Sequence, residues 1–308
     1  MAAPETQSAV TLIKEGFRKA GVKEAQLTGD ADYANATTTW MEEIKNDIQI
    51  AKQGRKLKPL QTNAIAISVL GQSKYANPTD FVEHISMEIM DGTNTGKATA
   101  GASSTITLVA GHGETTASIQ GKEIAIYTGT GLRQVRECIS IATNVLTVSP
   151  DWGTTPDSTS EYMIIDSYKD IVGPHHIGLM GDDRTTLTRG EPEKYYSRGD
   201  SNDGEFQLFP VPYRTEVDWN SVGRVWIIRL WYYADLQELD LSTSALLTTL
   251  YKRWRNIWVQ GIKVRKLERL SDRRYTGELA LYNQMIETLL IKETYENNLS
   301  NMQATVEG

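Results

Sequence analysis

The stretch DGTNTGKATAG, residues 91–101, decides the fold assignment because two different kinds of sequence meet there. It resembles a phosphate-binding loop, which has four residues between its first glycine and Gly-Lys, then Ser or Thr, then a helix. Here three residues separate Gly92 from Gly96, Ala98 follows Lys97, and the next residues favour a β-strand. We therefore predict a hinge into an inserted β-domain, in which glycine supplies turns and threonine supplies strands.

Residues 92–165 are predicted to form this inserted module, an all-β barrel or sandwich. Short alternating runs are separated by turn residues at nearly regular spacing, as in small all-β domains. The candidate strands are STITLVAG, KEIAIYTG, VRECISIA, NVLTVSP and EYMIID. Gly129 and Gly131 lie between two of these runs and fit a hairpin turn better than a dinucleotide site, which needs a following helix.

The sequence before the module predicts two helices and then strands. Apolar residues recur at helical spacing, and Gly21 and Gly54 are candidate helix ends. The two apolar faces comprise Val10, Ile13, Phe17 and Ala20 in the first helix, and Trp40, Ile44 and Ile48 in the second. Residues 62–70 and 81–91 then read as strands.

The sequence after the module predicts strands followed by a helical C-terminus. Strands are expected in GEPEKYY, GEFQLFPVP and GRVWIIRLWYY. A helix follows, with a stripe of Leu246, Leu250, Trp254 and Trp258, and Gly261 is expected to break it. A last helix from about Thr276 carries its apolar stripe on Leu279, Tyr282, Met285, Ile286 and Leu289.

These patterns together predict an α+β fold, with N-terminal and C-terminal helices around a small antiparallel sheet and an inserted all-β barrel or sandwich module. We expect a core formed by residues 1–91 and 166–261, the module at 92–165, and a separate C-terminal segment at 262–308.

Charge is unevenly distributed along the 308 residues. The net charge is −7, yet residues 252–274 hold nine bases against two acids, which is +7 and leaves −14 elsewhere. Such asymmetry indicates an acidic body with a basic element for an anionic partner. The first residues have no basic region leading into an apolar run, so we expect no secretory signal, and no apolar run is long enough for a bilayer. The single Cys138 excludes an intrachain disulfide and suits a reducing cytoplasm.

Catalytic and ligand-binding patterns are weak. His175 and His176, with Asp182-Asp183 nearby, lack the spacing of a metal site, so a solvated loop is favoured there. Cys138 falls in a predicted strand, where a buried inert thiol is the default. No Gly-x-Ser-x-Gly sequence is present. We expect no catalytic, cofactor or metal site.

Tryptophan clusters near the basic stretch. Five of the seven lie between Trp219 and Trp258. They are interpreted first as core between sheet and helix. The alternative is a subunit interface, where Trp, Tyr and Arg are enriched; its best candidates are Trp254, Trp258, Arg253 and Arg255.

The order of these segments resembles that of the head-to-tail adaptor, or head completion, proteins of tailed bacteriophages. The resemblance rests on an N-terminal helical pair, YANPTDFVEHISMEIMDG, GEPEKYY, GEFQLFPVP and WIIRLWYYADLQELD, then a helical C-terminus. It covers residues 8–91 and 166–300, with Asn77 where the family usually has leucine. The insert resembles a β-module of phage neck and tail proteins, through Gly129, Gly131, Gln134 and Arg136.

This resemblance implies a ring, usually dodecameric, in the virion neck at the head-tail junction, made in the host cytoplasm. The ring would dock under the portal protein, extend the channel through which genomic DNA passes without specific binding, and hold the next tail component (a nozzle, hub, tail-tube or terminator protein). It also implies portal docking by the C-terminal segment, and we expect its stripe to stay exposed until it meets the portal. The expected docking residues are the stripe named above with Arg265, Arg269, Arg273 and Arg274.

Three alternatives remain open from the sequence. A tail terminator or tube protein would be mostly β. A wall hydrolase carried in the neck would need a catalytic site. A nucleic-acid-binding protein would use the basic stretch and show steep salt dependence.

Overall fold

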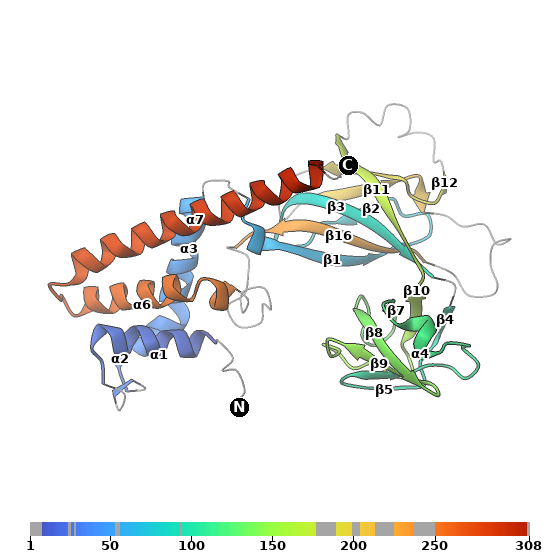
Figure 1. Ribbon diagram of the computed structural model, residues 1–308, viewed down its shortest axis with the longest axis horizontal. Coiled ribbons are helices and arrows are strands. Elements are labelled where there is room, and N and C mark those ends of the chain that lie inside the picture. The colour runs from blue at the N-terminus through green and yellow to red at the C-terminus, as the bar shows by residue number, and fades with distance from the viewer. Residues whose placement is uncertain are drawn as a thin grey trace. The chain divides into compact units, whose positions relative to one another are not determined.

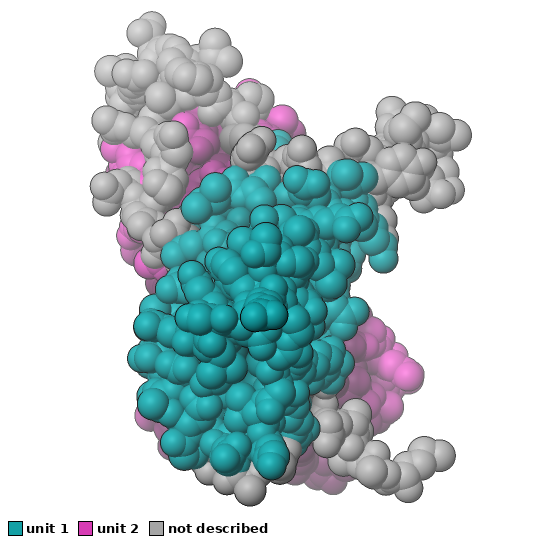
Figure 2. Space-filling model, turned by 90° about the vertical axis from the view of Figure 1, so that its left-hand side faces the viewer, with its two compact units in different colours: residues 1–62, 233–308 teal, residues 63–232 magenta. Residues whose placement is uncertain are grey.

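The computed structural model describes residues 8–23, 26–27, 29–52, 56–92, 94–176, 189–198, 204–212, 225–236 and 250–306. The chain divides into two compact units, Met1–Thr62 with Tyr233–Gly308 (unit 1) and Asn63–Tyr232 (unit 2). Figure 2 colours them separately. The protein is a mixed α and β structure with several sheets, in keeping with the predicted α+β class.

Unit 1 is helical (Figure 1). Its elements are α1 (Ala9–Ala20), α2 (Ala31–Asn35), a π-helical turn (Ala36–Trp40), α3 (Met41–Lys52), a 3₁₀ turn (Lys58–Leu60), α6 (Arg255–Arg269) and α7 (Tyr275–Val306). The predicted N-terminal helices are confirmed: Gly21 ends α1 in the left-handed conformation, and Trp40, Ile44 and Ile48 are buried. Among the described helices, none is both long and apolar enough to cross a membrane.

Unit 2 contains a seven-stranded sheet in the order β1-β16-β3-β11-β13-β14-β2. These strands are β1 (Gln61–Ile67), β16 (Ile227–Ala234), β3 (Phe81–Asp91), β11 (Ser167–His176), β13 (Lys194–Arg198), β14 (Glu205–Phe209) and β2 (Lys74–Ala76). The sheet is mixed and not wholly antiparallel, because β11 and β13 run parallel. A small parallel pair, β12 (Arg189–Gly190) and β15 (Val211–Pro212), lies apart from it in the strand order.

The inserted module is a second seven-stranded sheet, β4-β10-β7-β8-β9-β6-β5. It comprises β4 (Asn94–Lys97), β5 (Ala100–Ala102), β6 (Thr105–Thr107), the short helix α4 (Thr116–Ile119), β7 (Glu123–Thr128), β8 (Val135–Ala142), β9 (Val145–Ser149) and β10 (Glu161–Ile165). The two edge strands β4 and β5 are consecutive in the chain, so the sheet curls on itself. Its own core contains Trp152, Tyr162 and Leu146.

The glycines of the opening stretch serve close packing and not turns, which corrects the prediction. Added Cβ atoms at Gly92, Gly96 and Gly101 would lie 1.8 Å from the Ile164 carbonyl oxygen, 2.7 Å from the Tyr162 hydroxyl and 2.3 Å from the Pro156 carbonyl oxygen. None of the three has a positive φ. The start of the module therefore needs glycine because neighbouring chain passes close by.

Candidate functional site: two grooves beside helix α7

Helix α6 is the centre of unit 1, because two glycines let it approach its neighbours. A Cβ at Gly16 of α1 would lie 2.6 Å from Ile262 Cγ2, and one at Gly261 would lie 2.7 Å from Ile44 Cγ1 of α3. The prediction that Gly261 ends a helix is wrong: α6 continues to Arg269. The proposed boundary at 261/262 falls inside this helix. Leu246, the first residue of the predicted stripe, lies outside the described residues.

Helix α7 packs its stripe onto its own unit, which corrects the expectation of an exposed segment. Tyr282, Ile286 and Leu290 are 2%, 4% and 2% exposed. Leu279, Met285 and Leu289 are half-buried at the sides of the helix. Burial, and next the charge of Asp47, raises the pKa of the Tyr282 phenol, so this hydroxyl stays protonated and donates to Asp47 at 2.9 Å.

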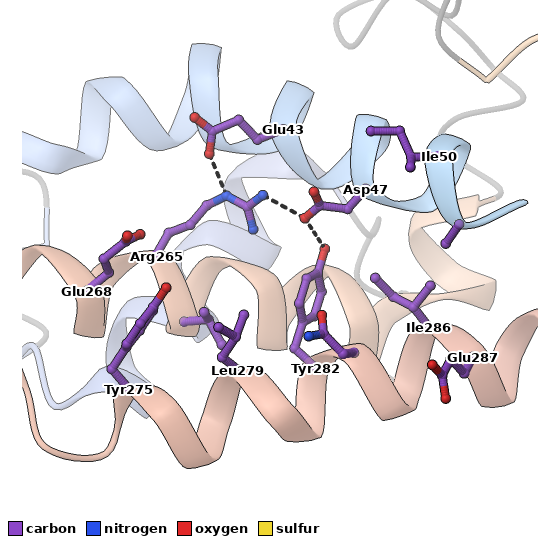
Figure 3. Close-up of a pocket in the computed structure, with 13 residues that line it drawn as sticks. Glu43, Asp47, Ile50, Arg265, Glu268, Tyr275, Leu279, Tyr282, Ile286 and Glu287 are labelled. Carbon is purple, nitrogen blue, oxygen red and sulfur yellow. Dashed lines mark hydrogen bonds and ion pairs between the residues drawn. The ribbon is translucent and has the colours of Figure 1, made fainter.

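One flank of α7 borders a cleft of about 540 Å³ against α3 and α6 (Figure 3). Arg265 Nε donates to Glu43 at 2.6 Å, and Arg265 Nη2 donates to Asp47 at 2.8 Å. Ile286 lines the apolar side. We call this the acidic cleft, because its lining has one arginine, Arg265, and four carboxylates: Glu43, Asp47, Glu268 and Glu287.

The other flank of α7 borders a groove of about 620 Å³ against the start of α6. We call it the basic groove; its bases are Lys252, Arg253 and Arg255, and its apolar lining includes Leu281, Met285 and Leu289. Arg253 donates to both oxygens of the buried Glu293 at 2.7 and 2.6 Å, and Arg255 pairs with Glu15. The two cavities share no lining residue.

Trp254 and Trp258 lie in the core of unit 1, 1% and 0% exposed. Trp254 Nε1 donates to Glu293 at 3.3 Å, and Trp258 meets Tyr251 edge-on at 5.1 Å between ring centroids. Both are therefore core residues, as first interpreted, but their core belongs to the helical unit 1. Trp254 lines the basic groove with Arg253 and Arg255 but is almost fully buried, and Trp258 does not line it.

The basic stretch is mostly neutralised within unit 1, which corrects its interpretation as a free cationic element. Six of its nine bases form ion pairs: Arg253 with Glu293, Arg255 with Glu15, Lys263 with Glu278, Arg265 with Glu43 and Asp47, Lys266 with Asp30 and Asp32, and Arg274 with Asp272. Lys252, Arg269 and Arg273 are exposed and have no ion pair within the described part of the chain. Of the four predicted docking arginines, two thus remain available.

The cysteine and the histidine pair considered as candidate sites both lie in strands of unit 2. Cys138 is buried, and burial raises the pKa of its thiol to about 12. His175 and His176 belong to the end of β11 and not to a solvated loop, while Asp182 and Asp183 lie outside the described residues. Within the described chain no group of His, Cys, Asp or Glu could hold a metal ion.

The glycine–x–glycine and Gln-x-Arg pattern of the module fixes a turn. Gly129 and Gly131 have φ of 78° and 85°. The Gln134 side chain donates to the Thr154 carbonyl at 2.7 Å and accepts from Gly153 N–H at 2.7 Å. Arg136 Nε donates to the Asp151 carbonyl at 3.0 Å. These side chains hold the β7–β8 hairpin to residues 151–154, a role in folding.

The outer side of α3 was not among the sites predicted from the sequence. Glu43, Asp47 and Ile50 are spaced i, i+4, i+7, which places them on one face, next to the buried face of Trp40, Ile44 and Ile48. A second stripe of that spacing was visible in the sequence.

In comparisons with known proteins, no family model matches this chain and no curated protein matches it.

Proposed function

We propose that this protein is a structural component of a bacteriophage neck, a head-to-tail adaptor that forms a ring under the portal, extends the DNA channel and holds the next tail component. The observation that carries the proposal is how the resembling segments assemble. Residues on either side of the insert share one sheet, through β3, β11, β13, β14 and β16, while residues 94–165 form their own sheet. The order that resembles the adaptors is thus interrupted by a separately built module.

Two further features favour the adaptor over its alternatives. Helices occupy both terminal regions of the described chain, whereas tail tube and terminator proteins are mostly β. The pairing of six bases weakens the nucleic-acid-binding alternative, because paired bases release fewer counterions from a phosphate backbone.

We propose Arg269 and Arg273, beside the turn between α6 and α7, as the bases that steer docking to the portal. Both are exposed. The double variant Arg269→Glu, Arg273→Glu should dock to DNA-filled, portal-bearing heads about tenfold more slowly at low salt, because charged pairs act mainly on association rate. Retention of DNA by heads that lack this protein, after addition of wild type or variant, measures the effect.

The matched control is Lys97→Glu, Lys194→Glu, which changes the net charge equally at two exposed sites of unit 2. Wild type that neither binds heads nor retains their DNA would contradict the adaptor proposal. Truncation after Gly261 cannot replace the charge-reversal variant as a test of docking. It removes part of α6 and all of α7, with the buried Tyr282 and Ile286.

A further inference from the structure

Helix α7 carries apolar side chains on more sides than its own unit covers. Tyr282, Ile286 and Leu290 are buried, but Leu281 is 45% exposed and Ile291 is 65% exposed. A helix that is apolar around its circumference normally packs on more than one side. The flank with Leu281, Met285 and Leu289 is the one that lines the basic groove. This flank therefore has the composition of a second packing surface.

The outer face of α3 has the opposite charge and an exposed apolar end. The side chains of Glu43 and Asp47 are 48% and 40% exposed, and both carboxylates contact the single Arg265. One turn further along, Ile50 is 74% exposed. We call Glu43, Asp47 and Ile50 the α3 edge. It is an acidic helical surface with one large apolar side chain to bury.

We propose that the α3 edge of one copy of this chain docks in the basic groove of a second copy. Charge complementarity favours the α3 edge as the partner of the basic groove. The groove contains Lys252 and an apolar lining, and the α3 edge contains carboxylates and Ile50. Such complementary surfaces steer association and fix its register. Lys252 is the base expected to respond most, since it has no ion pair within the described chain, unlike Arg253 and Arg255.

The contact joins two different surfaces, so it repeats from copy to copy. The acidic cleft beside the α3 edge contains Leu279 and Asn283 of α7, whereas the groove contains Leu281, Met285 and Leu289. At 3.6 residues per turn these two sets lie on different flanks. A head-to-tail contact closes into a ring or continues as a filament. The inference deepens the proposed ring and in that respect rests on the proposed function.

Sedimentation velocity of the purified full-length chain, over a range of protein and salt concentrations, tests the contact without heads or portal. Lys252→Glu and Ile50→Lys should each weaken self-association about tenfold or more, which is ~1.4 kcal/mol. Lys252 has no ion pair within the described chain and Ile50 is 74% exposed, so neither change should unfold unit 1. Mixing the two variants should restore association as far as a heterodimer, because the intact α3 edge of the Lys252→Glu chain complements the intact basic groove of the Ile50→Lys chain.

Two matched changes in unit 2 serve as controls: Lys97→Glu at an exposed lysine and Leu70→Lys at an apolar residue that is 61% exposed. Both should associate as wild type does. A wild type that stays monomeric, single variants that associate normally, or a mixture that regains nothing would each overturn the contact. The head assay above decides the adaptor proposal separately, because it scores DNA retention and not self-association.

Discussion

At the residue scale, Gly261 determines how closely α6 approaches α3 and α7. A Cβ there would meet Ile44 Cγ1 at 2.7 Å and the Tyr282 ring at 3.0 Å. Gly261→Ala should lower the free energy of unfolding of unit 1 by about 1–3 kcal/mol, the usual cost of overpacking. Gly277→Ala in α7 is the control: its Cβ meets nothing within 4 Å, and it should stabilise by about 0.4–1 kcal/mol. Urea unfolding followed by helical circular dichroism measures both; equal effects would contradict the packing argument.

His84 should make unit 2 sensitive to mild acid. It is 8% exposed among Phe81, Tyr195 and Phe206, and neither ring nitrogen has a hydrogen-bond partner among the residues that the structure describes. Burial, opposed weakly by Glu83, lowers its pKa from 6.5 to about 4. The unfolded state therefore binds the proton more readily than the folded state. The free energy of unfolding of unit 2 is unaffected by His84 above pH 6.5 and decreases as the pH falls towards 4.

Protonation of His84 should lower the free energy of unfolding by about 3 kcal/mol at most, because one pKa unit corresponds to 1.36 kcal/mol. His84→Leu should remove it and flatten the pH dependence of unfolding between pH 6.5 and 4.5, a range above most carboxylate titrations. If the variant and the wild type lose stability in parallel over this range, His84 is not the group responsible.

At the element scale, periodicity predicted what depends on neighbours along the chain. The stripe of Trp40, Ile44 and Ile48 gave α3, and alternation gave the strands of the module, including β7 and β8. Periodicity failed where the role of a residue depends on contact with an element that is distant in the sequence. Gly261 looked like a helix end, since nothing in the sequence shows that Ile44 lies against it.

The same limit applies to the candidate site. A stripe of Tyr282 and Ile286 looks identical in sequence whether it faces its own unit or a partner, and the structure places it on its own unit. The bases were visible but their acidic partners were not, because Arg265 and Glu43 are more than 200 residues apart in sequence, at a separation of 222. Ion pairing across such a separation changes which arginines remain free for a partner.

At the scale of the whole molecule, the module has its own sheet, from Asn94 of β4 to Ile165 of β10, but it is not independent of the first sheet. The chain enters and leaves it side by side, with Asp166 N–H donating to the Asp91 carbonyl at 2.9 Å. Besides its own core, it shares a buried apolar cluster with the first sheet, formed by Met90 and Ile227 on one side and Ala125, Tyr127, Met163 and Ile165 on the other. The ends of the module are therefore close enough for it to be excised, but its removal affects the packing of the first sheet.

Replacing residues 94–164 with a short Gly/Ser linker should leave unit 1 folded but destabilise unit 2. The ends are close enough for the linker, yet the deletion uncovers Met90 and Ile227, which are both 0% exposed in the full chain. An exposed apolar cluster of this kind promotes aggregation. Adding Met90→Thr and Ile227→Thr to the deletion should recover solubility, measured by light scattering, while the helical signal of unit 1 stays constant in all three proteins. If the plain deletion is as soluble as the full chain and its urea midpoint for unit 2 is unchanged, the shared cluster contributes nothing and the module is a fully separable domain.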